Sequence, residues 1–433
     1  MAKTYRPYCP DQLFLLPPSL QDWLPENHLS YFVSDVIDQL DLSAIESYYE
    51  SDDRGQPPYH PRMMTKVLVY AYCVGIFSSR KIQKRLIEDV AFRVLAAGNQ
   101  PDFRTVSDFR KIHLKALDGL FQQVLRLALE AGAIKLGRVA LDGTKVKANA
   151  SKHKAMTYAR MKEDERTLRE EVRKLLAQAK AVDDEEDKQY GKDKSGDELP
   201  DELSRRETRL RKIREAKRAL EERAREEAAE DGKSKEEAKE VKPKDKAQYN
   251  FSDPESRIMK GADGFVQAYN AQAVVESTTQ LIVAEAVTQE ANDKRQVAPM
   301  VEAIEQQAGQ KPEQLLADSG YCSDKNLEHL ESKGIDAYLA TERQKHGDKK
   351  TCKRGPLPTG ATRVDRMRRK VQTKAGAAIY AGRKSIVEPV FGQIKRARGF
   401  TQFTLRGLEK VRAEWALVCA THNILKMYRF CFN

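Results

Sequence analysis

The segment that most constrains the fold runs from residue 151 to residue 250, where 28 Lys and Arg residues stand beside 27 Asp and Glu residues. Side chains of this composition cannot build a globular core, but they can form long helices in which ion pairs link opposite charges. The pattern predicts an antiparallel helical hairpin, of the coiled-coil type, inserted at residues 152–248, with residues 183–200 as its mobile tip and residues 231–248 as its return. Apolar residues recur there, mostly at seven-residue spacing, at Met161, Leu168, Leu175 and Val182 and then at Leu203, Leu210, Ile213 and Leu220.

The hydropathy pattern excludes a membrane protein. The chain has 433 residues, of which 40% are hydrophobic. Its longest apolar run, residues 67–77, is far shorter than the roughly 20 residues that a membrane-spanning helix needs. No apolar stretch follows the basic residues near the N-terminus, so we expect no secretory signal and a cytoplasmic protein.

The net charge of +11 is unevenly distributed. Residues 251–340 carry 7 basic and 15 acidic side chains, whereas residues 341–433 carry 22 basic and 6 acidic ones. An acidic block followed by a strongly basic block predicts clustered carboxylates beside a surface that attracts polyanions. A chelated cation and a nucleic-acid backbone would satisfy both features.

The first 135 residues are predicted to be helical. We expect a basic amphipathic helix over residues 79–97, a turn at residues 98–101 and a second helix over residues 105–131 that begins in a capping box at Thr105. Two helices joined by a short turn are typical of a helix-turn-helix-like DNA-binding unit, although an ordinary helical subdomain with solvated cations has the same pattern. The cations expected to project from these helices are Arg80, Lys81, Lys84, Arg85, Arg104, Arg110 and Lys111.

The region after the first 135 residues is predicted to be an α/β sheet that the charged segment interrupts. A short apolar strand ends at Asp142 and has no partner before the charged segment begins. Two strands, a helix, a strand, a helix and a strand then follow in the sequence. Their expected positions are 264–275, 281–287, 294–307, 314–318, 324–333 and 335–339.

Asp142 and Asp318 are the strongest candidates for catalysis. Each stands at the carboxyl end of a predicted strand, and such ends face one crevice in an open α/β sheet. Ser319 and Gly320 favour a sharp turn that leaves the Asp318 carboxylate at the sheet edge. Two convergent aspartates suit Mg²⁺ or Mn²⁺ in phosphodiester cleavage, although aspartates also cap helices and turns.

A third carboxylate, Glu388, lies in the basic block. Lys395 follows seven residues later and Lys384 precedes by four, so the three side chains share one helical face. This arrangement would let the carboxylate meet a metal while the ammonium groups meet DNA phosphates. Ser385 to Glu388, followed by Pro389, fits a capping box at a helix start equally well.

Several motifs together resemble the DDE transposases of bacterial insertion sequences. The resemblance covers nearly the whole chain, including two N-terminal segments, residues 24–28 and 101–110, that are similar to the helical leader domain of that group. It implies a ribonuclease-H-like catalytic domain over residues 136–433, a DNA-binding domain over residues 1–135, and a metal-binding triad of Asp142, Asp318 and Glu388. The catalytic-domain motifs are DGTKVKANAS at 142–151, NFSDPESRIM at 250–259, YNAQ at 269–272, ADSGY at 317–321 and VEPVFG at 387–392.

The family pattern around the glutamate is Tyr, two residues, Arg, three residues, Glu, six residues, Lys. Glu388 and Lys395 fit it, but Lys384 stands at the Arg position and Ala381 at the Tyr position. The displaced neighbours of these two positions, Arg383 and Tyr380, are further candidates for DNA contact. Asp293 is a reserve carboxylate, which we expect instead to begin the helix that follows it.

The resemblance implies a transposase that binds the terminal inverted repeats of its element, cleaves each end and joins the freed 3′-hydroxyl to target DNA. Pairing two DNA ends implies a homodimer in the active complex, in the bacterial cytoplasm and associated with the nucleoid when bound to DNA. The charged hairpin could assist pairing or serve as a solvated spacer. A metal-dependent nuclease or resolvase of the same fold, and a non-catalytic repressor-like remnant, are the alternatives.

Overall fold

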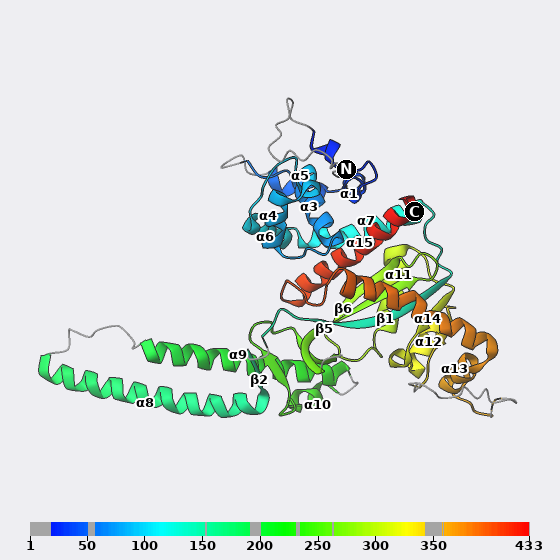
Figure 1. Ribbon diagram of the computed structural model, residues 1–433. Coiled ribbons are helices and arrows are strands. Elements are labelled where there is room, and N and C mark those ends of the chain that lie inside the picture. Colours follow the sequence, from blue (N-terminus) through cyan, green and yellow to red (C-terminus); the bar gives the residue numbers. More distant parts are fainter. Residues whose placement is uncertain are drawn as a thin grey trace, which may run out of the picture.

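The computed structural model describes residues 19–50, 57–151, 154–190, 201–230, 234–261, 264–342, 357 and 359–432. A group of N-terminal helices lies at one end of the molecule, a mixed sheet lies in the middle, and two long helices project to one side (Figure 1). Within the described residues, no helix is both long and apolar enough to cross a membrane.

The N-terminal region is helical, as predicted. Its core is the apolar helix α3, of which Val67 to Cys73 are all buried, and the C-terminal helix α15 (Leu408–Phe432) packs along α3 and α7. The α15 helix therefore joins the N-terminal helices to the sheet. The helices of this region are η1 (Leu20–Trp23), α1 (Leu29–Asp38), α2 (Ser43–Glu46), η2 (Ser47–Tyr49), α3 (Pro61–Cys73), α4 (Ser79–Glu88), α5 (Val90–Leu95), α6 (Phe103–Ile112) and α7 (Leu114–Glu130).

Two helices predicted as continuous are each divided in two. The helix expected over residues 79–97 breaks at Asp89, whose extended backbone ends α4 and whose carboxylate accepts a hydrogen bond from the Ala91 amide to cap α5. The helix expected over residues 105–131 breaks at His113, between α6 and α7. Its start is also earlier than predicted, because Asp102 caps α6 by accepting from the Thr105 amide at 2.7 Å.

The predicted mixed α/β region is present, with its strands and helices in the expected order. The central sheet has the strand order β6-β5-β1-β7-β8, in which β1, β7 and β8 are parallel and β5 is antiparallel to β1 and β6. A further strand, β4, pairs with the first half of β5. The elements are β1 (Arg138–Lys147), β4 (Arg257–Gly261), β5 (Gly264–Glu276), β6 (Ile282–Thr288), α11 (Val297–Ala308), β7 (Gln314–Ala317), η4 (Ser319–Tyr321), α12 (Asp324–Ser332) and β8 (Asp336–Leu339).

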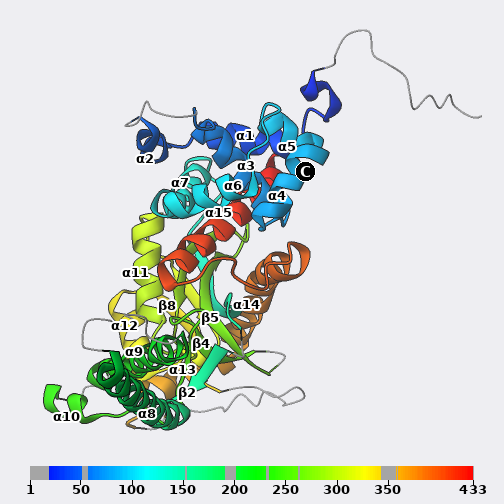
Figure 2. The same ribbon diagram turned by 90° about the vertical axis from the view of Figure 1, so that its left-hand side faces the viewer.

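Helices cover the sheet on both sides. Helices α11 and α12 lie on one side, and α14 (Lys374–Gly392), which follows α13 (Arg363–Gln372), lies on the other (Figure 2). The α15 helix runs beside β6, where the Asn423 side chain hydrogen-bonds both backbone groups of Ile282 and the Arg412 guanidinium donates to the Val287 carbonyl. Polar residues of α15 therefore satisfy backbone groups near both ends of the β6 strand.

The charged segment forms two long antiparallel helices, α8 (Tyr158–Tyr190) and α9 (Asp201–Glu230), which project from the sheet (Figure 1). Glu165 of α8 forms ion pairs with Arg214 and Lys217 of α9. The predicted apolar repeat supplies a small core separate from the main one, with Met161, Leu168, Leu210, Ile213 and Leu220 buried in it.

The ends of the charged segment differ in part from the prediction. Of the expected tip, residues 191–200 lie outside the described residues. The expected return contains α10 (Lys235–Glu240) and the start of β3 (Gln248–Asn250), which pairs with β2 (Ala155–Thr157). The return therefore contains a short helix and the start of a strand.

Candidate active site

Asp142 and Asp318 occupy equivalent positions on neighbouring strands. The parallel pairing of β1 with β7 ends at Leu141 opposite Ala317, and the next residue of each chain segment is an aspartate. Neighbouring strands lie about 4.8 Å apart, so the two residues start from adjacent points of the sheet. The β1 strand does not end at Asp142 as predicted; it continues to Lys147 because residues up to Lys147 pair with β5.

The Asp142 carboxylate is bound on both oxygens. Oδ1 accepts a hydrogen bond from the Gly143 amide at 2.8 Å, and Oδ2 accepts one from the Arg383 guanidinium at 2.9 Å. The side chains of Arg383 and Asp142 are only 11% and 23% exposed, so this ion pair is poorly screened by solvent. Burial raises the pKa of Asp142, Arg383 opposes that shift, and the nearby Asp318 carboxylate adds to it.

Asp318 directly follows β7 and forms the predicted sharp turn. Its backbone is extended, and its Oδ1 accepts a hydrogen bond from the Gly320 amide at 2.8 Å, which caps the 3₁₀ helix η4. The turn holds the carboxylate at the end of the strand, next to Asp142.

A further carboxylate, that of Asp293, lies beside the two backbone segments that follow Asp142 and Asp318. Its Oδ1 accepts hydrogen bonds from Asn270 Nδ2 at 2.6 Å and Gln272 Nε2 at 2.9 Å, and it forms an ion pair with Lys145 Nζ at 3.3 Å. Burial raises the pKa of the neighbouring Tyr321. The carboxylates of Asp293, Asp142 and Asp318 add to this shift, and Asp293 contributes the most of the three. The three aspartates thus share one electrostatic environment.

Two glycines that follow the catalytic candidates lie close to Asp293, and Gly143 leaves room for it and for the Gln272 amide. A Cβ atom on Gly143 would lie 2.3 Å from Gln272 Nε2 and 3.0 Å from Asp293 Oδ1. A Cβ atom on Gly320 would lie 3.6 Å from Asp293 Oδ2. Asp293 therefore packs against the turn after Asp318 and the strand after Asp142, and it supports the positions of both.

The expectation that Asp293 begins the following helix is wrong. Gln296 is the N-terminal cap residue of α11, and Asp293 contributes only a backbone carbonyl, which accepts from the Gln296 amide. The signal that could have identified it lies in β5, where Asn270 and Gln272 alternate within a buried strand. Buried amides need polar partners, so their spacing on one face of the strand predicts a polar group opposite.

The glutamate motif belongs to a longer helix than predicted. The α14 helix begins at Lys374, where Thr373 caps it, and it continues through Ser385 and Pro389 instead of starting there. Proline cannot donate to the carbonyl four residues earlier. Here Gln280 Nε2 donates to that Ser385 carbonyl at 2.9 Å, which compensates the missing helical hydrogen bond.

The α14 helix brings Arg383 to Asp142, whereas Glu388 faces away from that contact. Arg383, Val387 and Val390 are buried, and Glu388 is exposed. Two side chains that are five residues apart on a helix, such as those of Arg383 and Glu388, point in directions about 140° apart. Among the described residues, the Glu388 carboxylate has no hydrogen-bond or ion-pair partner.

Three other predicted residues lie on or near the same helix. Lys395, in the π-helical turn η5 (Gln393–Ala397), donates from Nζ to the Lys145 carbonyl on β1 at 2.8 Å, and burial lowers its pKa. Tyr380 lies beside Arg383, and burial raises its pKa. Lys384 is exposed.

Two family models match the chain. Residues 18–112 match a transposase domain (DUF772), and residues 233–424 match a transposase DDE domain. The chain belongs to the DDE transposases of insertion sequences. The DDE match contains Asp293, Asp318 and Glu388, while Asp142 lies between the two matched ranges. No curated protein and no solved structure matches the transposase.

The N-terminal cations of the transposase divide into an exposed group and one buried residue. Arg80, Lys81, Lys84, Arg85, Arg104 and Lys111 are exposed, as predicted. Arg110 is only 5% exposed, and its guanidinium donates to the Tyr72 hydroxyl and the Phe77 carbonyl. The expectation that Arg110 projects toward DNA is therefore wrong, because its donors hold α6 to α3 and to the loop that follows it.

The donor chemistry of the transposase site suits a divalent cation only in part. Asp142 and Asp318 supply the carboxylate oxygens that Mg²⁺ and Mn²⁺ prefer. However, Arg383 occupies one oxygen of Asp142, and no three His, Cys, Asp or Glu side chains among the described residues are arranged to hold a metal ion. Three carboxylates are therefore not assembled around one point among the described residues.

Proposed function

We propose that this transposase cleaves DNA at the ends of its element and transfers those ends into target DNA, with a divalent metal ion, Mg²⁺ or Mn²⁺. The observation that carries the proposal is the adjacency of Asp142 and Asp318 beyond the last parallel residue pair of β1 and β7. Two carboxylates at the crevice of an α/β sheet are placed to act on a phosphodiester that lies across it.

The catalytic and metal-binding residues in this proposal are Asp142, Asp318 and Glu388. When bound, the metal ion activates the attacking oxygen and stabilises the leaving oxygen of an in-line displacement. Asp142 and Asp318 would supply carboxylate oxygens to hold it, and Glu388 would supply a third carboxylate if α14 moved toward them. Arg383 and Lys395, with Tyr380 and Lys384, then contact the phosphates beside the scissile bond.

DNA is the partner of this site, and other parts of the chain contribute to binding it. The helical domain of residues 1–135 binds the terminal inverted repeats through its exposed cations, Arg80, Lys81, Lys84, Arg104 and Lys111. The catalytic domain of residues 136–433 is ribonuclease-H-like, and the helical hairpin inserted at residues 152–248 projects from it. A homodimer would pair the two ends, and the reaction would take place in the bacterial cytoplasm, on the nucleoid.

A strand-transfer assay tests the proposal. The substrate is a linear duplex that carries the element ends, with a supercoiled plasmid as target and Mg²⁺ present. Cleavage with joining supports transposition, whereas cleavage without joining indicates a nuclease or resolvase. Binding without cleavage by the wild type indicates a repressor-like remnant. Asp142→Asn should abolish cleavage and keep binding, and Asp35→Asn, an exposed change on α1, is the matched control.

A further inference from the structure

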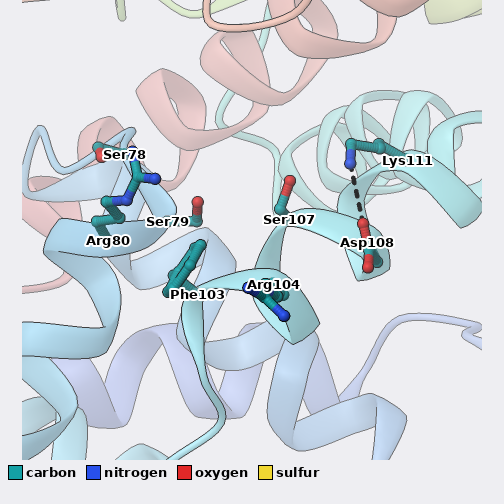
Figure 3. A pocket seen from close by; sticks show the side chains of 8 residues that line it. All are labelled: Ser78, Ser79, Arg80, Phe103, Arg104, Ser107, Asp108 and Lys111. Atoms are coloured by element: carbon teal, nitrogen blue, oxygen red, sulfur yellow. Dashed lines mark hydrogen bonds and ion pairs between the residues drawn. The ribbon is translucent and has the colours of Figure 1, made fainter.

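A polar pocket of about 440 Å³ lies between α4 and α6, on the side of the N-terminal helices that carries the exposed cations (Figure 3). Its lining includes Arg80, Phe103, Arg104 and Lys111, together with the hydroxyl groups of Ser79 and Ser107. Two helices thus supply cations and hydroxyls to one concave surface.

Phe103 organises the two arginines. The guanidinium of Arg80 lies 4.9 Å from the centre of the Phe103 ring, and that of Arg104 lies 5.8 Å from it. Figure 3 shows the ring between the two side chains. Cation–π contacts of this kind restrict a guanidinium without using its N–H donors. Neither arginine forms an ion pair within the described residues, so their donors are available to a ligand.

The remaining charges of the pocket leave it positive. Lys111 forms an ion pair with Asp108 at 2.9 Å, and both side chains are more than half exposed. An exposed pair of this type contributes little and exchanges easily for another anion. Three cations therefore face one carboxylate in the pocket. Lys81 and Lys84 are also exposed on α4, where Lys84 forms an exposed ion pair with Glu88 at 3.6 Å that a DNA phosphate could replace.

These groups match the chemistry of a phosphodiester. Guanidinium groups bind phosphate oxygens through paired N–H donors, and serine hydroxyls can donate to the same oxygens. The continuing positive surface favours a polyanion over a single small anion. The ring of Phe103 already contacts both arginines, so it does not offer a free face on which a base could stack.

We propose that this pocket holds one backbone phosphate of duplex DNA, as a contact that positions the helical domain and does not read sequence. The inference rests on the proposed function in one respect, that DNA is the partner. It adds which surface of the helical domain meets the duplex and which atoms hold it: Arg80 and Arg104 as the phosphate clamp, with Ser79 and Ser107 beside them.

The test measures binding of the full-length protein to a mixed-sequence 30-base-pair duplex by fluorescence anisotropy, in EDTA and over a range of NaCl concentrations. Arg80→Gln and Arg104→Gln should each weaken binding severalfold and reduce the slope of log affinity against log salt by about 1. Arg126→Gln, an exposed arginine on α7 outside the pocket, should change neither value. Circular dichroism spectra should be the same for all variants.

A misfolded variant would lose affinity for DNA, so a variant that gains affinity tests the pocket without this ambiguity. Asp108→Asn removes the pocket's one carboxylate and frees Lys111, so it should bind the duplex severalfold more tightly. A second duplex of unrelated sequence should give the same changes. The inference is overturned if the pocket variants bind like wild type at every salt concentration, or if the loss occurs with one sequence alone. Because the assay needs no cleavage, an inactive enzyme with these binding changes would contradict only the proposed function.

Discussion

The Arg383 guanidinium donates to Oδ2 of Asp142 at 2.9 Å and so joins α14 to β1 across 241 residues of sequence. The pair is mostly buried, so removing one partner leaves the other charge without compensation. The ion pair places a residue of the basic C-terminal block in direct contact with Asp142. It also keeps one carboxylate oxygen of Asp142 from any other cation.

Loss of this ion pair should destabilise the fold. Arg383→Gln should lower the free energy of unfolding by about 1–3 kcal/mol, because the Asp142 carboxylate then remains buried near Asp318 without its cation. Urea denaturation measures the change, and Lys384→Gln, on the exposed side of the same helix, should have almost no effect. A double-mutant cycle with Asp142→Asn should show coupling between the two sites, and strictly additive effects would contradict the direct contact.

Gly143→Ala should be poorly tolerated. The added methyl group would lie 2.3 Å from Gln272 Nε2, so the amide and Asp293 must move. Overpacking of this kind costs about 1–3 kcal/mol, which denaturant unfolding can measure. Gly137→Ala is the matched control just before the same strand, because its methyl group would meet only Glu313 Oε2 at 3.8 Å. Equal stability of the two variants would exclude the tight packing described at Gly143.

Asp293→Ala should reduce cleavage more than DNA binding. Without this carboxylate, Asn270, Gln272 and Lys145 lose a shared acceptor, and the backbone after Asp142 and Asp318 loses its support. We expect the cleavage rate to fall by at least about 10-fold, as it does when groups that orient catalytic ligands are removed. Affinity for DNA in EDTA should stay the same or increase, since a negative charge is lost. An equal loss of binding and cleavage would instead indicate general unfolding.

Stability should depend on pH through Glu285 on β6. Burial raises its pKa to about 8, Asp118 on α7 adds to the shift, and Arg412 opposes it. In the unfolded chain the pKa of a glutamate is about 4.3, so folding takes up a proton between these values. The stabilisation is complete below pH 4 and is lost as pH rises toward 8.

The variant that removes this titration is Glu285→Gln. Its free energy of unfolding, compared with that of wild type, should rise as pH increases from 5 to 8.5. Chemical denaturation at several pH values measures this difference, with Glu302→Gln, an exposed change on α11, as control. A difference that is constant with pH would show that Glu285 does not titrate in this range.

Sequence patterns predict the elements of this protein where local chemistry alone decides them. Asp318 followed by Ser319 and Gly320 indicates a strand that ends in a turn, and the turn is formed by those residues. The helix breaks at Asp89 and His113 were not predicted, because the amphipathic pattern continues across both of them. Arg110 fits an exposed cation by spacing, but its partners come from α3 and the loop after it.

The residues of the candidate site were likewise predictable only where the local sequence determines their position. The adjacency of Asp142 and Asp318 could be predicted because each directly follows the apolar residues of its strand, although β1 continues past Asp142 to Lys147. The local sequence around Asp293 does not indicate its place beside them, because its partners Asn270 and Gln272 lie on β5, and only their spacing there points to a polar group opposite. The start of α14 was misplaced because Pro389 normally marks a first turn, and only the Gln280 amide makes it acceptable in a helix interior.

The catalytic role of the carboxylates is tested by the rate of Mg²⁺-dependent cleavage at an element end by Asp318→Asn and Glu388→Gln, with DNA binding measured in parallel. We expect each variant to bind DNA like wild type and to cleave at least about 100-fold more slowly, since each removes a proposed metal-binding oxygen. Cleavage by Asp318→Asn at close to the wild-type rate would show that Asp318 is not a metal-binding residue of the reaction.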